Sequence, residues 1–212
     1  VCKDGIILGT EKIVVNKMML SGTDKRLYSI NIHTGGVING VIPDGRSVIQ
    51  RAREEANQYE SMFGIRCPGS VLADRIAMKF QMSTIYASYR PFGTSLIFAN
   101  HDAMKGFQLY MIEPSGACFQ YYGCASGRGK QIARNEIEKT KFADMTVEEA
   151  LPKIAKILLK CQDEMKEKKQ ELELSFISES SGFKHKIIDT NTVSAITKQA
   201  QSDIQNEDVE MK

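Results

Sequence analysis

The sequence predicts an α+β protein with a four-layer αββα sandwich, in which two stacked, mainly antiparallel sheets are flanked by helices. The order of its segments favours this fold: strands, two helices, strands, two helices, strands and a last helix. Each sheet buries an apolar face against the other, so helices between the blocks of strands are expected on the outer faces. A chain of 212 residues with 42% hydrophobic residues is long enough to bury such a core.

Three β-like runs open the chain, at residues 5–12, 27–32 and 36–42. Asp44 is then expected to cap a helix whose apolar residues recur at spacings of three and four. Gly64 is expected to end it, because glycine readily takes the left-handed conformation found after helices. This first helix is therefore predicted to be an amphipathic surface helix.

A second helix is expected from residue 70 to about residue 89, with Ser70 as its cap. Its apolar residues spread over most of its circumference, so the helix must be covered on more than one side. It should end before Pro91, since the residue that precedes a proline is disfavoured in the α region.

The second half repeats the order, with strands at residues 94–99, 107–113 and 117–122 and helices at 127–142 and 146–168. Thr146 and Glu149 have the spacing of a capping box at the start of the later helix. Pro152 lies deep in that helix and predicts either a kink or a later start. Two strands and one helix complete the chain, at residues 172–176, at residues 184–188 and from Val193 onward.

The predicted domain organisation is a single αββα domain over residues 1–202, followed by an acidic tail at 203–212 that is expected to be disordered. The chain starts at Val1 without a methionine, and a strand is already under way near Gly5. We therefore expect that residues precede Val1 in the complete protein.

Charge and composition narrow the class of partner. The chain has 28 basic and 26 acidic residues, a formal charge of +2 that gives no electrostatic reason to expect nucleic acid or a membrane as partner. It contains neither a signal peptide nor an apolar run long enough to span a bilayer. Proteins are therefore the expected partners.

Metal ions and cofactors are not expected. The five cysteines are widely scattered without a C-x-x-C pair, which favours a reducing, intracellular compartment. His33, His101 and His185 are isolated in sequence and fit surface or strand-edge positions better than metal ligands or catalytic bases.

Residues 123–130, GCASGRGK, resemble a phosphate-binding loop at first sight, because glycines precede a lysine and a helix. The spacing differs from that motif: five residues separate Gly123 from Gly129, and Gln131 stands where the magnesium-binding Ser or Thr belongs. A tight strand-to-helix turn is the simpler interpretation, and a small-molecule binder that uses this loop stays as an alternative.

Several segments taken in order resemble the proteasome α-type family over essentially the whole chain. They are GIILGTEK at 5–12, DKRL at 24–27, AREEA at 52–56, LADR at 72–75, RPFG at 90–93, QLYMI at 108–112, EIEK at 136–139 and ELELS at 171–175. The resemblance implies the amino-terminal-nucleophile hydrolase fold, which is the same αββα sandwich. It also implies that the missing start comprises an amino-terminal helix and the first strand.

The resemblance implies a non-catalytic ring subunit, not an enzyme on its own. In that fold the β-type relatives are the catalysts, with an amino-terminal threonine as nucleophile and a nearby lysine that tunes it. By register, the resemblance puts Arg26 at the lysine position and Glu11 at the aspartate position, and residues 165–171 replace the Asp-x-x-Ser-Gly-Gly segment of those relatives. Arginine stays charged and cannot share a proton as lysine can, so no catalytic residue is expected. A catalytically active β-type threonine peptidase is the alternative.

A binding pocket is also implied by the resemblance. In the family, a lysine at the position of Arg26 and backbone neighbours at Gly40 and Val41 form a pocket for the carboxylate that ends an activator's tail. Lys25 adds a second cation here, although an ordinary pair of surface cations explains the same residues. The implied partners are neighbouring α subunits, β-ring subunits and regulatory particles that serve ubiquitin-dependent degradation, in cytoplasm and nucleus, without a cofactor.

Overall fold

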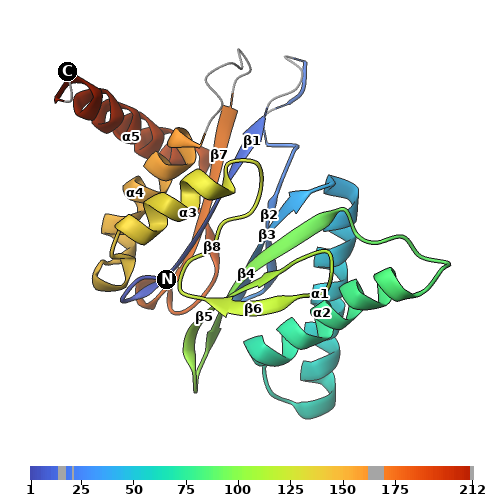
Figure 1. Ribbon diagram of the computed structural model, residues 1–212. Helices are drawn as coiled ribbons and strands as arrows, with labels where there is room; N and C mark the ends of the chain where they lie inside the picture. Colours follow the sequence, from blue (N-terminus) through green and yellow to red (C-terminus); the bar gives the residue numbers. More distant parts are fainter. Residues whose placement is uncertain (14–17, 21, 162–169, 211–212) are drawn as a thin grey trace.

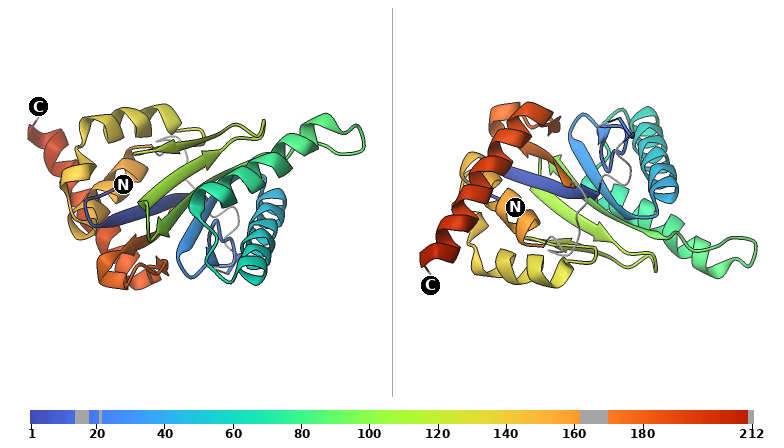
Figure 2. Two further views of the ribbon diagram at one scale, coloured as in Figure 1. Left: turned by 90° about the horizontal axis from the view of Figure 1, so that it is seen from below. Right: turned by 90° about the horizontal axis from the view of Figure 1, so that it is seen from above.

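The computed structural model describes residues 1–13, 18–20, 22–161 and 170–210. Two antiparallel sheets lie face to face in its centre, and helices cover both outer faces (Figures 1 and 2). Helices α1 and α2 lie on one side, and α3, α4 and α5 on the other. The predicted four-layer αββα sandwich is therefore confirmed.

The larger sheet has the strand order β2-β3-β4-β5-β6, with every neighbouring pair antiparallel. Its register places Leu27 opposite Val37 and Leu96 opposite both Ile38 and Ile112. The strands are β2 (Leu27–Asn31), β3 (Thr34–Gly40), β4 (Thr94–Asp102), β5 (Gly106–Ile112) and β6 (Cys118–Tyr121).

Helices α1 (Ile42–Phe63) and α2 (Gly69–Ile85) cover the outer face of this sheet. Their buried side chains pack against Phe98 and its neighbours in one apolar cluster. Gly64 ends α1 in the left-handed conformation, with φ of 68°, as the sequence predicts.

Neither predicted cap of these two helices forms. Helix α1 starts before Asp44, with Val41 at its N-cap, and Pro68 takes the N-cap of α2 in place of Ser70. Neither N-cap residue makes a capping hydrogen bond through its side chain. Helix α2 also ends at Ile85, earlier than expected, and an irregular segment leads on to β4.

The smaller sheet has the order β1-β7-β8, and its inner face packs on the larger sheet through an apolar cluster that includes Ile6, Leu109 and Ile177. Its strands are β1 (Gly5–Ile13), β7 (Gln170–Ser178) and β8 (Lys186–Ile187). Its outer face is covered by α3 (Lys130–Lys139), α4 (Val147–Lys160) and α5 (Thr190–Glu210). Two short 3-10 helices complete the fold, η1 (Phe142–Asp144) and η2 (Glu179–Ser181).

The capping box of α4 is confirmed: Thr146 Oγ1 accepts from the Glu149 N–H at 3.4 Å, and the Glu149 carboxylate accepts from the Thr146 N–H at 3.0 Å. Pro152 lies inside this helix, so the later start is wrong. The last part of the predicted helix, residues 162–168, lies outside the described residues.

At the carboxyl end, α5 continues through Glu210, whereas the sequence predicts disorder from Asp203. Described residues 203–210 are therefore helical. Among the described helices, none has the length and hydropathy that crossing a bilayer requires.

Candidate functional site

The residues predicted for the pocket meet at one end of the larger sheet. Arg26 directly precedes β2, Gly40 is the last residue of β3, and Val41 is the N-cap of α1. Because β2 and β3 are neighbours, the Arg26 carbonyl accepts a hydrogen bond from the Ile38 N–H at 2.9 Å. The fold thus brings Arg26 and its exposed neighbour Lys25 next to the turn that contains Gly40.

Glu173 on β7 fixes the backbone of Arg26. Its Oε2 accepts from the Arg26 N–H at 3.1 Å and from the Leu27 N–H at 3.3 Å. Its Oε1 pairs with Lys12 Nζ on β1 at 3.0 Å, and Glu171 Oε2 lies 3.8 Å from the same ammonium group. Lys12 is only 5% exposed, so this cation is held inside the protein by carboxylates.

Asp44 fixes the turn on the other side. The Val41 N–H donates to the Gly93 carbonyl at 2.9 Å, and the Gly93 N–H donates to Asp44 Oδ2 at 2.9 Å. Both terminal nitrogens of Arg90 donate to the Asp44 carboxylate, at 2.6 and 2.7 Å. The Arg90 contact, helped by the Gly93 N–H, lowers the pKa of Asp44 to about 2.

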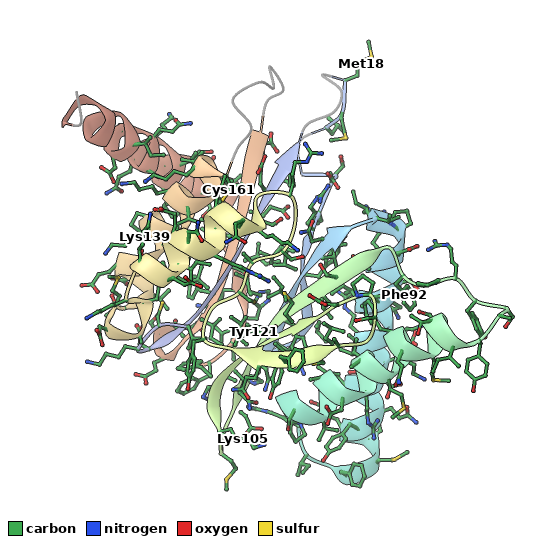
Figure 3. The ribbon with its side chains drawn as sticks, viewed as in Figure 1. Met18, Phe92, Lys105, Tyr121, Lys139 and Cys161 are labelled. Carbon is green, nitrogen blue, oxygen red and sulfur yellow. The ribbon has the colours of Figure 1, made fainter. Side chains whose placement is uncertain are left out.

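Phe92 holds the segment that carries Arg90 and Gly93 against the helices. It lies between α2 and β4, near α1 (Figure 3), and its ring packs on Phe80 with a centroid separation of 5.1 Å. Phe80 is fully buried in the apolar cluster under α1 and α2. The segment that pairs with Asp44 is therefore anchored to the hydrophobic core of the sandwich.

A cavity of about 400 Å³ lies beside Arg26. Glu11 also lines it, so the fold brings together the two residues that the family resemblance assigns to the lysine and aspartate positions. Gly40 and Val41 are outside this lining. Besides Arg26, the walls come from β1, β3, β4 and β5, from residues 124–130 and from α3 and α4. Cys161, just after α4, also lines the cavity (Figure 3).

Arg26 projects a cation into this cavity. Its Nε is buried and makes no hydrogen bond within the described part of the chain. A guanidinium group offers five N–H donors in a rigid fork, so it can receive a carboxylate or another anion there.

The glycine-rich loop forms a turn. The Lys130 N–H donates to the Gly127 carbonyl at 3.3 Å, and Gly129 is the N-cap of α3. Ser126 Oγ makes a 2.7 Å hydrogen bond with Ser95 Oγ on β4. This geometry favours the strand-to-helix turn over a phosphate-binding loop.

The three histidines, although isolated in sequence, lie around the segment between β7 and β8. His33 Nδ1 lies 2.6 Å from the Phe183 carbonyl oxygen, and the His101 ring stacks on the Phe183 ring at 4.0 Å. His185 Nδ1 lies 2.7 Å from Ser29 Oγ, and burial lowers the pKa of His185 to about 4. Within the described ranges, no group of three His, Cys, Asp or Glu residues is arranged to hold a metal ion. The histidines tie the two sheets together.

Comparisons with known proteins identify the family. The model of a family described as "Proteasome subunit" matches residues 1–177. A proteasome subunit alpha type-3 from Spinacia oleracea is 45% identical over 190 residues, which cover 90% of this chain and 76% of the relative. One from Dictyostelium discoideum is 45% identical over 186 residues, which cover 88% and 75%. A probable proteasome subunit alpha type-7 from Saccharomyces cerevisiae is 36% identical over 212 residues, which cover 98% and 73%. The chain belongs to the proteasome subunit family.

These relatives also settle the type of subunit. They are named as alpha-type subunits, alpha type-3 in two cases and alpha type-7 in the third, which confirms the resemblance to the α-type family seen in the sequence. The chain is accordingly a non-catalytic α-type subunit that assembles with other proteasome subunits, and the β-type threonine peptidase is the wrong alternative. Arg26, which the resemblance assigns to the lysine position, agrees with this, because a guanidinium does not deprotonate.

Proposed function

We propose that this subunit docks regulatory particles on the α ring and supports the gated passage of substrates for ubiquitin-dependent degradation. One observation carries the proposal: Arg26 and the Gly40–Val41 turn lie at the same end of the larger sheet, where Glu173 binds the backbone of Arg26 and Gly93 binds that of Val41. The ligand is the carboxylate that ends an activator's tail.

The chemistry of the pocket suits such a tail. Arg26 can bind a carboxylate through two parallel N–H···O bonds, and Lys25 adds positive charge that attracts the tail from solution. Gly40 and Val41 are exposed, and the strand that Gly40 ends is the neighbour of β2, so their backbone can contact the last residues of an extended peptide.

Contacts with neighbouring subunits are expected on the face of α1 and α2. Met78 and Ile85 on α2 are 59% and 66% exposed, and Tyr86 and Tyr89 continue this apolar surface beyond the helix. The end of α2 and the segment after it project from the body of the molecule (Figures 1 and 2). Permanent interfaces are large and apolar, so we propose that flanking α subunits or the β ring cover this face.

The proposed location is the cytoplasm and nucleus. All five cysteines are free, which suits a reducing compartment.

The test uses assembled particles that carry Arg26→Ala or Lys25→Ala in this subunit. A short synthetic peptide from the C-terminus of an activator subunit, with a photoreactive group, is cross-linked to them, and mass spectrometry measures the share attached to this subunit. We expect Arg26→Ala to abolish concentration-dependent attachment and Lys25→Ala to weaken it. An amidated copy of the peptide should attach poorly, because it lacks the terminal charge. Equal attachment of both peptides to wild-type and variant particles would mean that Arg26 and Lys25 are ordinary surface cations.

A further inference from the structure

Two carboxylates outside the predicted pocket are hydrogen-bonded to its backbone, Glu173 directly and Asp44 through Gly93. Asp44 lies in the first turn of α1 and binds the Gly93 N–H, whose own carbonyl accepts from the Val41 N–H. Glu173 lies on β7 and binds the N–H groups of Arg26 and Leu27. Both carboxylates are thus linked to the pocket by one or two hydrogen bonds.

Neither carboxylate is free to bind a ligand. Both oxygens of Asp44 accept hydrogen bonds from Arg90, and Oδ2 also accepts from Gly93. Both oxygens of Glu173 are occupied, one by Lys12 and the other by two backbone N–H groups. Their side chains are 10% and 17% exposed, so water competes little for these bonds.

Each carboxylate is also paired with a cation, and this matters for an anionic ligand. Arg90 pairs with Asp44, and Lys12 pairs with Glu173 at 3.0 Å, nearer than its second carboxylate, Glu171, at 3.8 Å. These cations reduce the repulsion that Asp44 and Glu173 exert on an incoming tail carboxylate. The positive charge of Arg26 and Lys25 stays available to the ligand.

We propose that Asp44 and Glu173 are positioning residues of the activator-tail pocket, with Arg90 and Lys12 as their neutralising partners. The inference rests on the proposed function. Glu173 fixes the backbone from which the Arg26 side chain extends. Asp44, through Gly93, fixes the backbone position of the Gly40–Val41 turn. The spacing between the cation and the peptide-binding backbone depends on both.

Asp44→Asn tests the role of Asp44 directly, because no orientation of the amide can accept all the hydrogen bonds that the carboxylate accepts. The amide NH₂ must face either an Arg90 nitrogen alone or an Arg90 nitrogen together with the Gly93 N–H, and it cannot accept from them. Glu55→Gln is the matched control. Glu55 is also on α1, is 17% exposed and pairs with an arginine, Arg75, at 3.1 Å, but it lies between α1 and α2.

The experiment applies the same cross-linking peptide, at increasing concentration, to particles with Asp44→Asn, Glu173→Gln, Glu55→Gln or Arg26→Ala. We expect Asp44→Asn and Glu173→Gln each to raise the half-saturating concentration about fivefold, the equivalent of roughly 1 kcal/mol of binding free energy. Glu55→Gln should stay at the wild-type value even if it lowers the melting temperature as much. If Asp44 and Glu173 only stabilised the fold, their variants would lower the melting temperature without changing the half-saturating peptide concentration.

The outcomes separate the two proposals. If Arg26→Ala abolishes attachment while Asp44→Asn and Glu173→Gln leave it at the wild-type value, the positioning role is overturned and the pocket stands. If Arg26→Ala has no effect, the pocket itself is overturned. Where Asp44→Asn particles fail to assemble, Arg90→Lys replaces it, because Arg90 is 70% exposed and lysine keeps the charge but loses the two-nitrogen contact. Arg90→Lys should then weaken attachment in the same direction, and wild-type attachment would overturn the role of this pair.

Discussion

Gly40 shows, at the scale of single residues, why one position of the pocket requires glycine. Its φ is +118°, and a Cβ added there would lie 2.3 Å from the Gly93 carbonyl oxygen. That oxygen already accepts from the Val41 N–H, so it cannot move freely. Backbone geometry explains this glycine even without a ligand.

We expect Gly40→Ala to lower the free energy of unfolding by about 3 kcal/mol, from backbone strain and the contact with Gly93 together. Gly64→Ala is the control, because Gly64 also has positive φ but an added Cβ would meet no atom within 4 Å. Gly64→Ala should lower the free energy of unfolding by only about 1 kcal/mol. Urea unfolding followed by circular dichroism measures both, and equal losses would contradict the role given to the Gly93 contact.

His185 makes stability depend on pH. Burial lowers its pKa from the ordinary value of 6.5 to about 4, so the folded protein favours the neutral ring. Its contribution is therefore complete above pH 6.5 and is lost as the pH falls from 6.5 toward 4. The free energy of unfolding, measured at several pH values, should fall over this window, and His185→Gln should flatten the fall. An unchanged pH profile in that variant would exclude His185 as the cause.

Among the elements, the helix starts show which local signals can be trusted. The capping box of Thr146 and Glu149 forms as predicted because both partners lie within one turn. Asp44 is an equally good capping residue, but its carboxylate is bound by Arg90 and Gly93, which lie 46 and 49 residues further on. A local pattern cannot reveal such distant competitors, so the prediction failed there.

The apolar face of α2 gives a prediction about assembly. We expect Ile85→Glu to reduce incorporation into particles severalfold and to leave the stability of the chain within about 0.5 kcal/mol, because Ile85 is largely exposed in the single chain. Met104→Glu is the control, since Met104 is 93% exposed in the turn between β4 and β5, on a different part of the surface. Native gel analysis of a tagged chain measures incorporation. Normal incorporation of Ile85→Glu would remove this face from the interface.

For the whole molecule, the order of strands and helices was enough to predict the fold class, because each segment shows its own periodicity. The candidate site was predictable only in part. The family resemblance points to Arg26, Gly40 and Val41, but Glu173, 147 residues from Arg26, joins them only when β7 pairs with β1. The same holds for the histidines, whose contacts form across both sheets.

Lys12, Glu173 and Arg26 connect the two sheets, and this connection leads to the last prediction. Lys12 and Glu173 lie on neighbouring strands of the smaller sheet, and Glu173 holds the residues at the start of β2 in the larger one. Lys12→Met leaves a mostly buried carboxylate without its cation, so we expect a loss of about 3 kcal/mol in the free energy of unfolding.

The double variant Lys12→Met/Glu173→Gln should show a smaller loss of unfolding free energy than Lys12→Met alone. A neutral glutamine needs no cation, and with Lys12 removed its oxygen can still accept from the Arg26 N–H. Urea unfolding of the wild type, both single variants and the double variant gives the coupling energy directly. Additive losses would mean that the two side chains act independently, and that the sheets are joined at this end by apolar packing instead.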